Sequence, residues 1–132
     1  MQTTTNIQDS KRAQAYFENK VAFTTGPIEL SHQLENRNLN IVDVREAEDY
    51  EKGHIPGAVN LPRASWENAA RSLSKDKANV VYCYSQQCHL AANACVAFAS
   101  KGFPVTELEG GFETWKENEL RTEQGRQMKV AA

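Results

Sequence analysis

The sequence predicts an α/β fold, a doubly wound parallel sheet with helices on both faces. Short runs of β-branched and apolar residues, typical of buried strands, alternate along the chain with amphipathic segments of helical periodicity. No internal repeat and no Pro/Gly/Ser-rich linker interrupts this alternation. Strands that are separated by helices pair in parallel through crossover connections, so the pattern favours one layered α/β domain.

The chain is expected to form one domain with an extension at each end. Residues 1–26 are an N-terminal extension with a helix, residues 27–120 form the α/β domain, and residues 121–132 are a C-terminal tail without a clear apolar face. Ser10 can cap the helix of the extension, which runs to about Val21. Its apolar stripe consists of Ala13, Phe17 and Val21.

Residues 27–73 are expected to supply two strands and three short helices. A proline suits the opening turn of the first helix, a glycine ends the second, and a serine caps the third. The expected elements are a helix beginning at Pro27, a strand at 40–44, a helix at 47–52, a strand at 58–61 and a helix at 65–73.

Residues 79–119 are expected to supply two more strands, at 79–83 and 104–108, and helices at 88–101 and 111–119. The apolar face of the helix at 88–101 consists of Ala91, Ala94, Cys95 and Phe98. In parallel sheets, ligands bind beyond the carboxyl ends of the strands. Cys83 ends a strand and is therefore expected at that edge.

The composition excludes several classes of protein. With 40% hydrophobic and 24% charged residues, the chain has the amino-acid composition of a globular protein rather than that of a disordered one. Fifteen basic against seventeen acidic side chains leave no basic patch for nucleic acid. No apolar run approaches the roughly 20 residues that span a bilayer, and the first six residues lack the pattern of a secretory signal. We expect a cytoplasmic protein that binds neither nucleic acid nor membrane.

Three cysteines, Cys83, Cys88 and Cys95, lie close together in the sequence. An odd number argues against a closed disulfide framework, and in a reducing compartment close cysteines more often mean chemistry or metal binding. Their spacing lacks the two close pairs that structural zinc prefers, so no metal site is expected. Cys95 is expected in the core.

Residues 80–89 are typical of a strand, a short loop and the start of a helix. The backbone N–H groups of such a loop can converge above the helix N-terminus and form an anion site. A thiol at its centre is expected to have a lowered pKa and to act as a nucleophile. The alternative is that Cys83 is a small, inert, buried residue.

Three motifs resemble the rhodanese (sulfurtransferase) family. The opening motif covers residues 41–46 (IVDVRE) and 50–62 (YEKGHIPGAVNLP), the central motif is 81–83 (VYC) with the loop and helix that follow, and the closing motif is 108–115 (LEGGFETW). They occur in the family's order over about residues 27–120. The resemblance implies a rhodanese-like fold in a single-domain member of the family.

The resemblance implies that Cys83 is the nucleophile. It would take sulfur from a donor such as thiosulfate or a persulfide and hold it as a persulfide until a thiol or protein acceptor removes it. Asp43 and Arg45 match the family's supporting Asp-x-Arg, and no cofactor is implied. The implied substrate-binding loop, whose backbone N–H groups hold the donor, consists of Tyr84, Ser85, Gln86, Gln87 and Cys88.

Position 88 departs from the family pattern. Many single-domain members have an arginine five residues after the nucleophile, where this chain has Cys88. Without that guanidinium, thiosulfate is expected to be a poor donor and a small or protein-borne persulfide a better one. Two roles for Cys88 stay open, a resolving thiol that attacks the persulfide and a residue packed at the helix start. Arg63 is a candidate for replacing part of the missing charge.

Three functions are compatible with these residues. A sulfurtransferase or persulfide carrier that uses Cys83 is favoured, because the nucleophile is retained. The second is a non-catalytic rhodanese-like module that binds a partner or an anion through the same loop. The third is a redox enzyme, similar to arsenate reductases, that uses Cys83 and Cys88 as a thiol pair. The oligomeric state stays open.

Overall fold

A five-stranded parallel sheet forms the centre of the molecule in the computed structural model, which describes residues 9–35 and 38–126. The strand order is β1-β5-β4-β2-β3, so β4 is the central strand. The strands are β1 (Thr24–Thr25), β2 (Leu39–Asp43), β3 (Val59–Asn60), β4 (Ala78–Tyr82) and β5 (Val105–Leu108). The predicted α/β class with a parallel sheet is confirmed.

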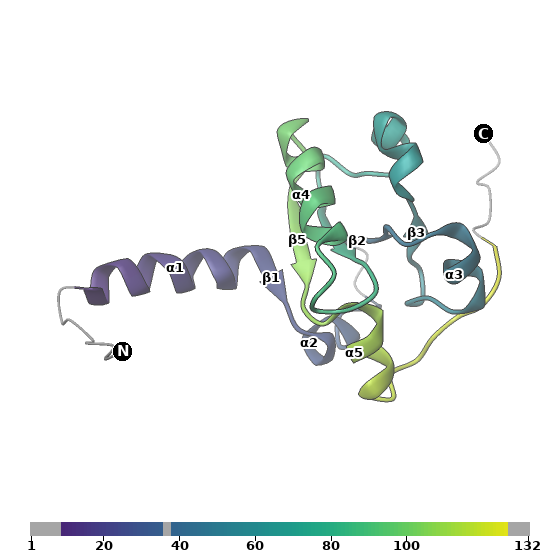
Figure 1. Ribbon diagram of the computed structural model, residues 1–132, viewed down its shortest axis with the longest axis horizontal. Helices are drawn as coiled ribbons and strands as arrows, with labels where there is room; N and C mark the ends of the chain where they lie inside the picture. Colours follow the sequence, from purple (N-terminus) through teal and green to yellow (C-terminus); the bar gives the residue numbers. More distant parts are fainter. Residues whose placement is uncertain (1–8, 36–37, 127–132) are drawn as a thin grey trace.

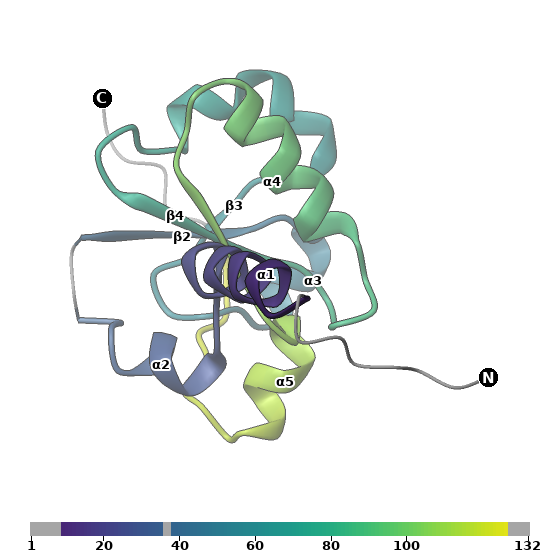
Figure 2. The same ribbon diagram turned by 90° about the vertical axis from the view of Figure 1, so that its left-hand side faces the viewer.

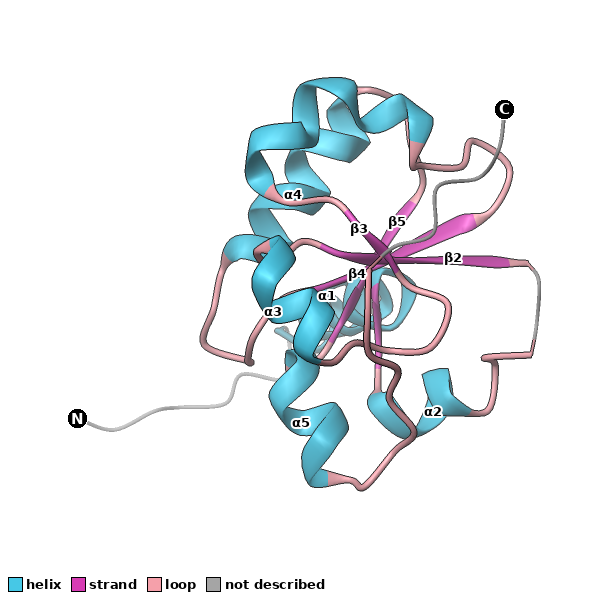
Figure 3. Ribbon diagram, turned by 90° about the vertical axis from the view of Figure 1, so that its right-hand side faces the viewer, coloured by secondary structure: helices cyan, strands magenta, loops and turns pink. Residues whose placement is uncertain are grey.

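Helices cover both faces of the sheet (Figure 3). One apolar cluster packs α4 and η2 against the sheet, and a second cluster packs α2, α3 and α5 against the opposite face. The helices are α1 (Ser10–Phe23), α2 (Pro27–Ser31), α3 (Ala47–Lys52), the 3₁₀ helix η2 (Arg63–Arg71), α4 (Leu90–Ser100) and α5 (Gly111–Glu117).

The side chains of β4 alternate between the two clusters. Val80 and Tyr82 belong to the cluster on the α5 side, whereas Val81 belongs to the cluster on the α4 side. Successive side chains of a strand point to opposite faces, so the next residue, Cys83, points to the α4 side. The register of the central strand therefore directs the cysteine toward the helix that follows it.

Two segments differ from the sequence-based expectation. The expected helix at 65–73 is the 3₁₀ helix η2, in which Asn68 has non-helical backbone angles (φ −105°, ψ 23°) and separates two short turns. The pair Thr24–Thr25, which lies within the predicted extension, forms β1 and pairs with Glu107 and Leu108 at one edge of the sheet. Residues 1–8 of the expected extension and 127–132 of the expected tail lie outside the described residues.

Helix α1 projects away from the edge of the sheet (Figures 1 and 2). It buries none of its side chains, and Phe17 and Val21 of its expected apolar stripe are 56% and 79% exposed. Within the described part of the chain, no helix has the length and apolar character needed to cross a bilayer.

Candidate active site in the loop after β4

Cys83 lies directly after β4, at the start of the loop that leads into α4. Its side chain is 2% exposed and packs within the cluster on the α4 side. The thiol donates a hydrogen bond to the carbonyl oxygen of Cys88, with the sulfur 3.4 Å from that oxygen. The N–H groups of Ser85 and Ala91 also bond to the Cys83 sulfur. The loop and the first turn of α4 thus surround this sulfur with backbone groups.

The protonation of Cys83 differs from the sequence-based expectation. Burial, with a smaller contribution from the neighbouring Cys88 thiol, raises the pKa of the Cys83 thiol to about 11. The backbone donors of the loop oppose this shift but do not outweigh it. The expectation of a lowered pKa for the free thiol is therefore wrong, because the sulfur is too deeply buried and lies beside a second thiol.

Cys88 is the more exposed of the two thiols, being half-buried. Its partial burial acts to raise its pKa, but the N–H of Leu90, the Cys83 thiol and the N–H of Tyr84 together lower it. These contacts stabilise the charged form of the sulfur. Of the two thiols, Cys88 is consequently the one that the loop favours as a thiolate.

The start of α5 holds the cysteine loop in place. The N–H of Phe112 donates to the carbonyl oxygen of Cys83, and the N–H of Glu113 donates to that of Tyr84, both at 2.9 Å. The closing motif of the sequence thus forms one wall of the site. Sequence reasoning noted this motif only as a resemblance and did not place it against the cysteine.

Gly111 fits its position because it lacks a side chain. Its φ is +61°, and a Cβ there would lie 2.7 Å from the backbone nitrogen of Ser85 and 2.8 Å from the carbonyl oxygen of Cys83. The side chain of Gln86 adds a second connection, since its Oε1 accepts a hydrogen bond from the N–H of Gly110 at 2.5 Å. The sequence predicted only a backbone role for Gln86.

A buried ion pair lies beneath the loop. The Arg45 guanidinium donates to the Asp43 carboxylate, with Nη2 2.8 Å from Oδ2, and to the carbonyl oxygen of Gly53 at 2.6 Å. Tyr82 donates its hydroxyl to the same carboxylate at 2.7 Å. Burial and this carboxylate raise the pKa of Tyr82 well above its ordinary value. Every buried polar side-chain atom in the described residues has a hydrogen-bond partner.

Tyr84 connects the ion pair to the cysteine loop. The Arg45 guanidinium lies 5.7 Å from the centre of the Tyr84 ring. The Tyr84 hydroxyl donates to Asp49 at 2.5 Å and accepts a hydrogen bond from the N–H of Glu46 at 3.2 Å. Because Tyr84 follows Cys83 directly, these contacts hold the beginning of the cysteine loop in position.

Arg63, the candidate cation of the sequence analysis, and His54 of the opening motif both lie in structural contacts. Arg63 is exposed, with its guanidinium 5.7 Å from the centre of the Trp66 ring on η2. His54 is buried, its ring stacks on Tyr50, and its Nδ1 lies 2.7 Å from the Tyr50 carbonyl oxygen. No cluster of three or more metal-binding side chains occurs among the described residues.

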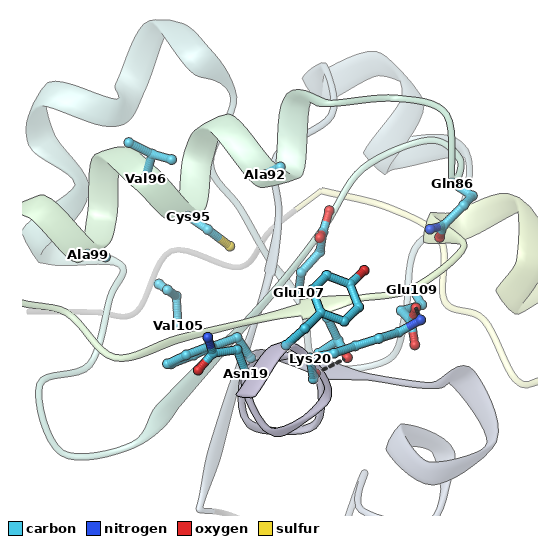
Figure 4. Close-up of a pocket in the computed structure, with 13 residues that line it drawn as sticks. Asn19, Lys20, Gln86, Ala92, Cys95, Val96, Ala99, Val105, Glu107 and Glu109 are labelled. Atoms are coloured by element: carbon cyan, nitrogen blue, oxygen red, sulfur yellow. Dashed lines mark hydrogen bonds and ion pairs between the residues drawn. The ribbon is translucent and has the colours of Figure 1, made fainter. Parts of the chain in front are cut away.

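Cys95, the third cysteine, lies on α4 and packs against the same apolar cluster as Cys83. It is half-buried rather than fully in the core, and it lines a groove of about 610 Å³ between α1, α4 and β5 (Figure 4). Burial and the nearby Glu107 raise its pKa to about 12. The side chains of Tyr16 and Phe23 from α1 form the opposite wall of this groove.

The fold and the loop define a class of protein. A parallel α/β sheet directs a buried cysteine from its central strand into a loop of backbone donors. A family model described as "Rhodanese-like domain" matches residues 27–118. The chain belongs to this family, so the resemblance of the three motifs is confirmed.

Known proteins with different named functions are similar to the chain. It is 37% identical over 86 residues to the thiosulfate sulfurtransferase GlpE of Coxiella burnetii, covering 63% of this chain and 77% of that protein. It is 34% identical over 97 residues, 74% of its length, to the HTH-type transcriptional regulator Rv0324 of Mycobacterium tuberculosis. The chain spans only 43% of the length of that regulator.

The fold also matches a solved structure. The crystal structure of the BH2092 protein of Bacillus halodurans superimposes with a TM-score of 0.80 and is 33% identical in sequence. The match covers 87% of this chain and 86% of that one. The rhodanese-like architecture therefore extends over most of the chain.

Proposed function

We propose that the chain is a sulfurtransferase that carries sulfane sulfur as a persulfide on Cys83. The observation that carries the proposal is the position of this thiol, at the end of the central strand and among backbone groups of the loop. The similarity to a thiosulfate sulfurtransferase supports the same reaction class.

The proposed reaction begins when the Cys83 sulfur, as a thiolate, attacks the sulfane sulfur of a donor. The bond between that sulfur and the donor breaks, and the donor leaves as a thiolate or, from thiosulfate, as sulfite. The product is a persulfide at Cys83. The N–H groups of Ser85 and Ala91 would stabilise its negative charge. An acceptor thiolate or cyanide then attacks the outer sulfur and returns the Cys83 thiolate.

The loop favours a persulfide as the donor over thiosulfate. Thiosulfate carries two negative charges, and the loop offers it backbone N–H groups with the uncharged or anionic side chain of Cys88 beside them. The sulfane end of a low-molecular-weight or protein persulfide carries at most one negative charge and needs no fixed cation. The proposed substrate class is therefore a persulfide, with a thiol as acceptor.

The experiment is the transfer of sulfur to the reduced protein. Wild type is mixed with glutathione persulfide or thiosulfate, and the intact mass and cyanide-dependent formation of thiocyanate are measured. We expect sulfur transfer with the persulfide, weaker transfer with thiosulfate, and none in Cys83→Ser. Cys95→Ser is the matched control and should behave as wild type. A complete absence of transfer from both donors would favour a non-catalytic binding module.

A further inference from the structure

Cys83 and Cys88 face each other across the loop. The N–H of Cys88 donates to the carbonyl oxygen of Ser85 at 3.2 Å, so the loop turns back toward its own start. This turn places the Cys83 sulfur 3.4 Å from the Cys88 carbonyl oxygen, and the two thiols are close enough for each to shift the pKa of the other. Both cysteines are free thiols. The site therefore brings the Cys83 sulfur to the backbone of the residue that carries the second thiol.

The two sulfur atoms have different surroundings. Cys83 is almost fully buried, whereas Cys88 is half-buried at the mouth of the loop. The N–H groups of Tyr84 and Leu90 bond to the Cys88 sulfur and stabilise its thiolate. A thiolate in contact with a persulfide attacks its sulfur and forms a disulfide when the leaving group is stable. Cys88 has the position and the ionisation that this step needs.

We propose that Cys88 is a resolving thiol that attacks the inner sulfur of the Cys83 persulfide, forms a Cys83–Cys88 disulfide and releases hydrosulfide. This inference rests on the proposed function. It makes the chain a persulfide-reducing enzyme, with a persulfide as substrate and hydrosulfide as product, in addition to a sulfur carrier.

The step balances without an external oxidant. The Cys83 persulfide first takes up a proton from solvent on its outer sulfur. The bond between the Cys83 Sγ and this sulfane sulfur then breaks, and its electron pair and the proton leave with the hydrosulfide. The bond between the two Sγ atoms forms from the electron pair of the Cys88 thiolate. The two cysteines are oxidised by two electrons and the sulfane sulfur is reduced by two. Two equivalents of a low-molecular-weight thiol then reduce the disulfide and return both cysteines.

The test is a single turnover with the full-length reduced chain. One equivalent of glutathione persulfide is added without further thiol, the reaction is stopped with an alkylating reagent, and the intact mass and released sulfide are measured. We expect wild type to form an intramolecular disulfide and to release up to one sulfide per chain. Cys88→Ser should instead keep the additional sulfur and release at least tenfold less sulfide in the same time. Cys95→Ser is the matched control and should follow wild type.

Each outcome separates the resolving role of Cys88 from the proposed sulfur-carrier function of Cys83. If wild type keeps its persulfide as long as Cys88→Ser does, the resolving role is wrong and the proposed sulfur carrier stands. If peptide mapping finds the sulfur transferred to Cys88, the resolving role is also wrong, because the attack took place on the outer sulfur. If neither wild type nor either variant takes up sulfur, the proposed function itself fails. Cys88→Ala repeats the test should Cys88→Ser unfold, as judged by circular dichroism.

Discussion

The N–H of Phe112 donates a hydrogen bond to the carbonyl oxygen of Cys83 at 2.9 Å. The two residues are far apart in the sequence, one after β5 and the other after the neighbouring strand β4. This bond, together with the close approach of Gly111, makes the turn before α5 a wall of the cysteine loop. The shape of the loop thus depends on the closing motif as well as on its own residues.

Gly111→Ala is expected to damage the site. The added Cβ would meet the backbone of Ser85 and Cys83 at under 3 Å, and the residue would keep a positive φ. We expect the free energy of unfolding to fall by about 1–3 kcal/mol and sulfur loading to slow at least tenfold. Urea unfolding and the rate of persulfide formation measure these effects.

Gly57→Ala is the matched control for this substitution. Gly57 also has a positive φ, +81°, but nothing lies within 4 Å of its added Cβ. The backbone strain should lower stability in this variant while sulfur loading stays close to wild type. Loading at the wild-type rate in Gly111→Ala would show that the contact does not shape the loop.

Arg45→Met is expected to be strongly destabilising. It leaves the Asp43 carboxylate buried without its cation, with Tyr82 as the remaining side-chain donor. Breaking one partner of a buried ion pair costs about 3–5 kcal/mol. In the control Arg126→Ala, the exposed pair with Glu51 is lost, and the expected change is under about 1 kcal/mol. Equal losses of unfolding free energy in the two variants would contradict this account.

The order of thiol alkylation follows from the two pKa shifts. At pH 7.5 a lowered pKa gives Cys88 more thiolate, whereas a pKa of about 11 keeps Cys83 protonated. Only the thiolate reacts, so iodoacetamide should modify Cys88 first, as measured by peptide mapping over time. Cys95, with a pKa near 12, should react slowly. Modification of Cys83 ahead of Cys88 would contradict the assignment.

A cation at position 88 is expected to improve the use of thiosulfate. In Cys88→Arg, a guanidinium at the mouth of the loop would attract the dianion and stabilise the charge that develops on the leaving sulfite. We expect the rate of loading from thiosulfate, relative to glutathione persulfide, to rise about tenfold. Cys88→Gln, which adds a polar side chain without charge, should leave this ratio unchanged. A similar rise in both variants would exclude charge as the cause.

Much of the fold could be predicted from the sequence because its elements are regular. The apolar run before Cys83 predicts a buried strand, and the residues after Cys88 have helical periodicity. These two patterns together predict the position of the loop between β4 and α4. β1 was missed because two residues, Thr24–Thr25, are too few to show any periodicity. Its place in the sheet depends entirely on pairing with β5.

The site was harder to predict because its properties arise from contacts between distant or competing groups. The bond from Gly110 to the side chain of Gln86 joins segments that no local pattern connects. The sequence predicts the wrong direction for the Cys83 pKa shift. The backbone donors can be inferred from the loop sequence, whereas the extent of burial and the proximity of Cys88 cannot. Burial outweighs the donors in the folded loop.

The most direct test of the central claim is to locate the transferred sulfur in Cys88→Ser, the variant in which the persulfide should persist. After reaction with glutathione persulfide and trapping by an alkylating reagent, peptide mapping should find one additional sulfur on the peptide that contains Cys83. Cys83→Ser should carry none. Additional sulfur on Cys95 alone, or on no cysteine, would contradict the assignment of Cys83 as the sulfur carrier.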